Sequence, residues 1–270
     1  MGYDEIATKS LLLTFEGVFA VRLIKVRVQN YRSIIDSGEI EIEKLKTILV
    51  GPNEAGKTVL LKAIQQLNRP DDVPGFDVLR DYPRSLLNDI QTKKVDPKDV
   101  TVVTGYFELD DEDKQLIPSE FHECTYRFYR NLDNQGYHSL VGGPKKVRFN
   151  EIKKDFLRIT SHMDKQFAED DGVKPSQSFK TLTNDWADDE IIAGEASKVL
   201  KSWLEEHYQF VEEENEKEEN RYSVLVEKVE LKSKENEVLK ILSNRKPKFV
   251  LFSNYFRVHP AIHLEHLAQR

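Results

Sequence analysis

The octapeptide from Gly51 to Thr58, Gly-Pro-Asn-Glu-Ala-Gly-Lys-Thr, constrains the fold of this chain more than any other segment. It fits the pattern G-x-x-x-x-G-K-[ST], in which a glycine-bounded loop leads directly into a helix. The short apolar run over 47–50 is typical of a strand buried on both faces, and apolar residues recur at helical spacing over 59–67. The sequence therefore predicts a strand, a tight loop and a helix in succession.

The residue types in this loop are those that a phosphate site needs. Consecutive backbone N–H groups at a helix N-terminus form a nest for an anion, and glycines let the backbone approach phosphate oxygens closely. The Lys57 ammonium can reach β- and γ-phosphates, and the Thr58 hydroxyl can ligate Mg²⁺. The predicted nucleotide-binding residues of the loop are Gly51, Asn53, Glu54, Ala55, Gly56, Lys57, Thr58 and Val59, with Thr58 also the predicted metal ligand.

Apolar patterning on both sides of the loop predicts a mixed α/β fold. Runs rich in β-branched and aromatic residues indicate strands, and the last two of them form a hairpin pattern around a turn at 133–136. These predicted strands cover residues 21–28, 38–43, 100–109, 124–130 and 137–141. Between them, the Pro- and Asp-rich stretch 69–98 reads as a loop with one short helix near residue 86.

The patterning becomes helical beyond residue 150. We expect amphipathic helices around 152–159, 200–211 and 238–242, and a loop over 165–185. Residues 221–231 are compatible with a strand or a helix, and 248–252 with a strand. The predicted organisation is a leader (1–20), a P-loop ATP-binding lobe with an antiparallel β subdomain (21–144), a helical insertion (145–246), and a return strand with a C-terminal tail (247–270).

Composition excludes several classes of protein. The chain has 270 residues and a formal net charge of −7, and its single cysteine, Cys124, rules out an internal disulfide. No apolar run approaches the length of a membrane span, and the acidic N-terminus does not fit a signal peptide. We therefore expect a cytoplasmic protein with no membrane partner.

Three segments resemble one class of ATPase. With Asn53 in its third place, the loop is similar to that of the ABC-class heads of RecF, the SMC proteins and the OLD family. Residues 26–34, Val-Arg-Val-Gln-Asn-Tyr-Arg-Ser-Ile, resemble their first strand and its N-[FY]-R-S ending, and 247–255 resemble a segment of OLD-type ATPases. The resemblance implies ATP and Mg²⁺ as cofactors and places Arg32 near the nucleotide. The insertion is too short for SMC arms, which favours the OLD and RecF side.

The sequence also departs from that class. Hydrolysis there needs a Walker B strand that ends in an acidic pair and an LSGGQ-like signature from an opposing protomer, and the sequence contains neither. The acids over 107–112 follow no apolar run, so the catalytic residues are unknown. We therefore expect the N-terminal part of a longer ATPase or half of a split one, acting as a homodimer or with a second ATPase lobe.

The implied role is in DNA metabolism, including DNA repair, or in anti-phage defence, with DNA or a nuclease as partner. A basic stretch over 145–158 could contact a phosphate backbone, but a solvated helix face is the favoured interpretation. Two alternatives stay open. One is a nucleotide-dependent interaction module without turnover, and the other is a small-molecule P-loop kinase, which the β-rich stretch 100–141 fits poorly.

Overall fold

The computed structural model describes residues 21–52, 55–168, 172–211 and 215–251. The chain divides into two compact units. The first comprises Met1–Asp113, Cys124–Val141 and Leu242–Arg270, and the second comprises Lys114–Glu123 and Gly142–Ile241. The functional boundaries predicted from the sequence, at 21–144, 145–246 and 247–270, stay a prediction.

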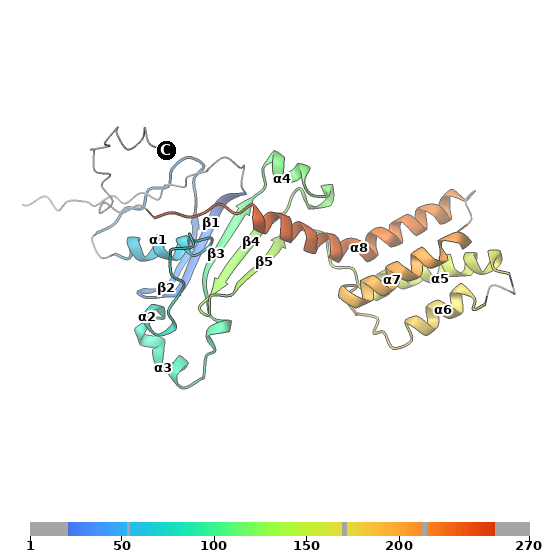
Figure 1. The fold of residues 1–270 in the computed structure, drawn as a ribbon, viewed down its shortest axis with the longest axis horizontal. Helices are drawn as coiled ribbons and strands as arrows, with labels where there is room; N and C mark the ends of the chain where they lie inside the picture. The colour runs from blue at the N-terminus through green and yellow to red at the C-terminus, as the bar shows by residue number, and fades with distance from the viewer. Residues whose placement is uncertain (1–20, 53–54, 169–171, 212–214, 252–270) are drawn as a thin grey trace, which may run out of the picture. The chain divides into compact units, whose positions relative to one another are not determined.

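The first unit is built on a five-stranded antiparallel sheet (Figure 1). Its strand order is β2-β1-β3-β4-β5, so every strand except β2 and β5 lies between two neighbours. The strands are β1 (Arg22–Tyr31), β2 (Ile34–Glu41), β3 (Thr101–Glu108), β4 (Thr125–Asn131) and β5 (Gly136–Val141). The five strand predictions and the β4–β5 hairpin are confirmed, because β-branched and aromatic residues fit a pleated, half-buried surface.

One face of this sheet is apolar and packs beneath helix α1 (Lys57–Gln65). Val26 and Phe107 are fully buried on it, whereas Lys25 on β1 forms an ion pair with Glu39 on β2 at 3.0 Å. The Leu67 side chain, in the segment after α1, lies close over Gly105. A Cβ there would stand 2.9 Å from Leu67 Cδ1, so a larger residue would force the surrounding side chains to shift.

Two predicted strands do not form. Residues 47–50, expected to be a buried strand, have no regular structure, and the side chains of Ile48 and Val50 are 53% and 76% exposed. Residues 248–251, the described part of the predicted return strand, are also irregular. Both predictions were wrong because a strand needs a neighbour for its backbone hydrogen bonds, and the described residues provide none at either place.

The return segment is nevertheless well anchored. The backbone N–H of Phe249, which is fully buried, donates to the Asn68 carbonyl at 3.0 Å. The Asn68 side-chain amide donates in turn to the Lys246 carbonyl at 2.9 Å. These bonds fix the chain against the end of α1 without adding a strand to the sheet.

Short helices join α1 to β3 in the stretch predicted as mostly loop. They are α2 (Val78–Asp81), α3 (Leu87–Gln91), and the 3₁₀ turns η1 (Arg84–Leu86) and η2 (Pro97–Asp99). The Asp77 carboxylate caps α2 by accepting from the N–H groups of Leu79 and Arg80. After β3 come α4 (Asp111–Gln115) and the 3₁₀ turn η3 (Ser119–Phe121).

The second unit is helical. Its elements are α5 (Phe149–Gln166), α6 (Pro175–Leu182), α7 (Gly194–His207), η5 (Tyr208–Phe210) and α8 (Glu216–Asn244), the last entering the first unit at Leu242. The three predicted helices are present, and the ambiguous stretch 221–231 is part of α8. The expected loop over 165–185 was wrong, since Pro175 begins α6 there at the position where proline is best tolerated.

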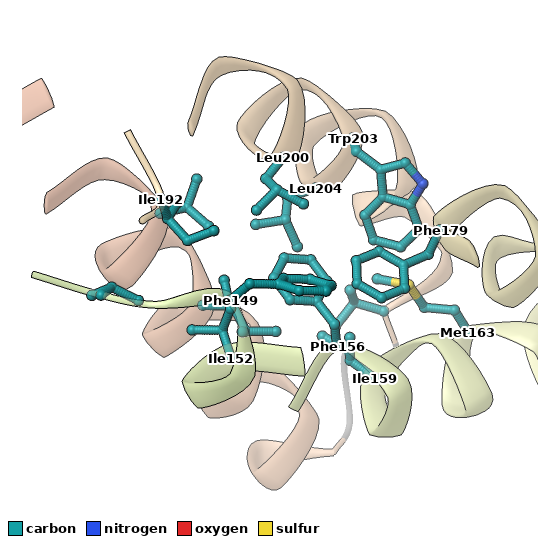
Figure 2. Close-up of a cluster of buried hydrophobic side chains, with 14 residues drawn as sticks. Phe149, Ile152, Phe156, Ile159, Met163, Phe179, Ile192, Leu200, Trp203 and Leu204 are labelled. Carbon is teal, nitrogen blue, oxygen red and sulfur yellow. The ribbon is translucent and has the colours of Figure 1, made fainter. Parts of the chain in front are cut away.

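Aromatic rings form the centre of the helical unit (Figure 2). Phe156 of α5 and Phe179 of α6 stack at a centroid distance of 4.7 Å, and the Trp203 ring meets both edge-on. The Trp203 indole N–H donates to the Ser178 hydroxyl at 3.0 Å, so its polar atom is satisfied. The architecture as a whole is mixed α/β, with an antiparallel sheet and a helical insertion, as predicted.

We expect Phe156→Ala to lower the free energy of unfolding of the helical unit by about 3–5 kcal/mol, because it leaves a cavity in this aromatic core. Both tryptophans of the chain, Trp186 and Trp203, lie in this unit, so their fluorescence during urea denaturation reports on it alone. Leu157→Ala, at the next position and 41% exposed, is the matched control and should change stability by no more than about 0.5 kcal/mol. Equal effects of the two variants would contradict the packing shown here.

Candidate functional site

The loop at the start of α1 has the backbone geometry of an anion nest. Gly56 is left-handed, with φ 85° and ψ 2°, and α1 begins at the next residue. A side chain at this φ would be strained, which accounts for glycine. No side chain caps α1, and its first turn contains no acidic residue, so the positive end of the helix dipole faces the loop without a neighbouring carboxylate in that turn.

The Lys57 side chain folds back over the loop. Its ammonium donates to the carbonyl of Gly51 and, at 2.7 Å, to that of Pro52, and the Ala55 N–H also donates to Pro52. The cation is therefore held over the same loop as the helix N-terminus. Thr58 and Val59 follow in the first turn and are half-buried. Asn53 and Glu54, also predicted to bind the nucleotide, lie outside the described residues.

The turn between β1 and β2 lies beside this loop. The Ser33 hydroxyl oxygen is 3.7 Å from the position that a Cβ on Gly56 would occupy. Its neighbour Arg32 is left-handed, with φ 53°, a conformation that costs free energy for a residue other than glycine. The structure thus brings the segment of Arg32, 19 residues before Gly51 in sequence, next to Gly56.

Asp81 fixes Arg32 in that conformation. Its carbonyl accepts from the Arg32 backbone N–H at 2.7 Å, and its Oδ1 accepts from Arg32 Nε at 2.9 Å and lies 2.8 Å from Arg32 Nη2. The Asp81 side chain is only 3% exposed, and its Oδ2 accepts from the Asp77 N–H at 2.9 Å. Both carboxylate oxygens are therefore bonded, which offsets the cost of burying the charge.

The surroundings of Arg32 favour the protonated form of its guanidinium. Burial by itself lowers the pKa of its guanidinium, but the bond to Asp81 and the nearby Tyr31 outweigh this, so the pKa lies above its usual value. The guanidinium also lies over the Tyr31 ring, 5.3 Å from the centroid. Burial, and then the Asp81 charge, raise the pKa of the Tyr31 hydroxyl. Arg32 therefore stays positively charged and the Tyr31 hydroxyl stays neutral across the physiological pH range.

An open groove adjoins this turn, and sequence reasoning did not find it. Its volume is about 840 Å³, and its cationic side chains come from the turn, from α1 and from the α2–η1 segment. Its lining residues are Arg32, Ser33, Ile35, Lys62, Arg80, Tyr82, Pro83, Arg84 and Ser85. No motif could have shown it, because the four cations come from three separate parts of the sequence.

The basic stretch over 145–158 is partly neutralised by nearby acids. Lys153 pairs with Asp188 at 2.8 Å, and the Arg148 guanidinium donates to the Asp189 carbonyl at 3.3 Å. Lys153 also lies over the Phe149 ring, 5.3 Å from its centroid. These two cations therefore have local partners that hold the start of α5.

The acids at the end of β3 form hydrogen bonds within the protein. Asp110 and Asp113 each accept from the backbone N–H of the other, and fully buried Asp113 also accepts from the Arg245 guanidinium. Burial raises the pKa of Asp113, while bonds from Asp110 and Arg245 oppose the shift. Across the described ranges, no cluster of His, Cys, Asp or Glu could hold a metal ion.

The residues of the loop fit a nucleoside triphosphate with its Mg²⁺. A left-handed glycine, an uncapped helix N-terminus and an adjacent ammonium supply donors only, which suits phosphate oxygens and disfavours a cation alone. The Thr58 hydroxyl is of the type that joins a phosphate-bound Mg²⁺. Asp81, bonded to Arg32 and Asp77, keeps the neighbouring turn in place.

Comparison with known proteins agrees with this chemistry. The chain matches the family model described as AAA ATPase domain over residues 22–269. No curated protein matches it. Within the described part of the chain, no helix is long and apolar enough to cross a membrane.

We expect Asp81→Asn and Arg32→Gln to be strongly non-additive in the free energy of unfolding. Each removes the same ion pair, so a double-mutant cycle should give a coupling of about 0.5–3 kcal/mol. Arg84 lines the same groove without an ion-pair partner among the described residues, so Asp81→Asn with Arg84→Gln is the matched control cycle and should be additive. Additivity of the Asp81–Arg32 cycle would show that the pair does not hold the turn.

Proposed function

Because the chain belongs to the AAA ATPase domain family, we propose that residues 51–59 bind Mg-ATP and form the nucleotide site of an ATPase of the OLD or RecF type. The observation that carries the proposal is the Lys57 ammonium held on the loop carbonyls directly before an uncapped helix N-terminus. These groups place a mobile cation and fixed backbone donors around one point, which is the arrangement that a triphosphate needs.

Each residue of the loop has a proposed role. The backbone N–H groups around Gly56 hold phosphate oxygens, and the Lys57 ammonium exchanges its loop carbonyls for oxygens of the β- and γ-phosphates. The Thr58 hydroxyl ligates Mg²⁺, which when bound offsets charge on the phosphates. Arg32, oriented by Asp81, presents its guanidinium from the neighbouring turn.

The wider role follows from the resemblance of the loop and of residues 26–34 to OLD and RecF ATPases. We place the protein in DNA metabolism or anti-phage defence, acting as a homodimer or with a second ATPase lobe. The sequence lacks Walker B and signature motifs, which supports a second candidate as well. That candidate is an interaction module whose partner binding depends on ATP but which does not hydrolyse it.

Lys57→Ala should weaken Mg-ATP binding by about 10- to 100-fold, since a charge-assisted bond of this kind contributes roughly 1.5–3 kcal/mol. Titration with a fluorescent ATP analogue measures it. Lys93→Ala is the control, because Lys93 is exposed and lies outside the P-loop and the groove. If both variants bind like the wild type, the loop is not a nucleotide site.

We expect the 270-residue chain to bind ATP yet to release phosphate at a rate near background. Loss of a water-orienting carboxylate or of a trans-acting transition-state group costs about 10³–10⁵ in rate, roughly 4–7 kcal/mol of barrier. Phosphate release at saturating Mg-ATP is the assay, and Lys57→Ala controls for a contaminating ATPase. Robust turnover that depends on Lys57 would show that a carboxylate of this chain completes the site, and would eliminate the module without turnover.

A further inference from the structure

We propose that the groove beside the P-loop, lined by Arg32, Lys62, Arg80 and Arg84, binds the sugar–phosphate backbone of a single-stranded nucleic acid. The inference names a partner site for the proposed ATPase and rests on the proposed function for its biological role. Binding itself requires only the charge and shape of the groove. We argue it from these two properties in turn.

The lining of the groove carries an excess of positive charge. Lys62, Arg80 and Arg84 are exposed, and none has an ion-pair partner within the described ranges. Two acids lie near the groove: Asp81 is buried and bonded to Arg32, and Asp77 accepts from the backbone N–H of Arg80. The lining itself contains four cations and no Asp or Glu. This excess of positive charge attracts a polyanion, which releases its counterions on binding.

The cations are also held on ordered elements. Lys62 lies on α1, Arg80 on α2, and Arg84 at the start of η1. The Asp77 cap fixes the start of α2, and the bonds between Asp81 and Arg32 fix its end to the β1–β2 turn. Because the supporting backbone is bonded in this way, a ligand does not have to order it.

The concavity of the groove is the reason for assigning a single strand. The charges line an open groove of about 840 Å³, and a flexible strand bends into a concavity more readily than a rigid duplex does. Ile35, 53% exposed, offers an apolar surface, and the hydroxyls of Ser33 and Ser85 offer further donors. The aromatic ring of the lining, Tyr82, is buried at 5% exposure, so we expect backbone contacts with little sequence preference.

The test is fluorescence anisotropy of a labelled 20-nucleotide oligothymidylate with the full chain over a range of salt concentrations. Lys62→Gln/Arg84→Gln should lower affinity by about tenfold or more at low salt. It should also reduce the slope of log affinity against log salt by about 1.4, since each lost phosphate contact on a single strand accounts for about 0.7. Lys93→Gln/Lys94→Gln removes the same charge outside the groove lining and should change the slope little.

Further measurements distinguish strand binding at the groove from ATP binding at the P-loop. Lys57→Ala should leave oligothymidylate binding intact, so failure of ATP binding and failure of strand binding are read independently. Circular dichroism melts establish that the groove variant is folded.

Equal losses of affinity in the groove and control variants would overturn the proposal, as would a wild-type dissociation constant weaker than about 10⁻⁴ M at physiological salt. Equal affinity for a duplex of the same length would overturn the single-strand assignment, and competitive displacement by ATP would assign the groove to the nucleotide.

Discussion

The carboxylate of Asp81 is the point on which the geometry of the candidate site depends. A buried charge is tolerable only when its oxygens are bonded, and here Arg32 and the Asp77 N–H supply those bonds. In return, the Asp81 carbonyl and carboxylate hold Arg32 in a left-handed conformation that its own residue type disfavours. One residue therefore ties the α2 segment to the β1–β2 turn, which lies against Gly56.

The sheet provides the base for this arrangement. β1 is hydrogen-bonded to β2 on one side and to β3 on the other. The turn that carries Arg32 follows β1 directly, so the two neighbouring strands hold its starting point in place. The helix carrying Lys57 and Lys62 is seated on the same sheet, and the chain after it approaches the backbone of Gly105 closely. The loop and the groove thus share one rigid support, as precise positioning of phosphate ligands requires.

The sequence predicted what is encoded locally and missed what depends on distant partners. β-branched and aromatic composition was sufficient for β3 and, with the turn at 133–136, for the β4–β5 hairpin, and the octapeptide located the loop. The run over 47–50 has a strand-like composition, yet it forms no strand because no described segment pairs with it. Arg32 entered only through resemblance, and Asp81 not at all, because its role arises from a contact across 49 residues that no local pattern reveals.

The four cations of the groove would contribute to ligand binding in different ways. Arg32 is paired with Asp81, so the two together add little net charge, and Arg32 contributes directed N–H donors whose positions are fixed. Lys62, Arg80 and Arg84 supply the long-range attraction, which salt screens over roughly 10 Å at 0.1 M. Under the proposed assignments Arg32 faces both the nucleotide and the strand, so either ligand alters its availability to the other. Linkage then requires the effect on affinity to be equal in both directions, whichever ligand binds first.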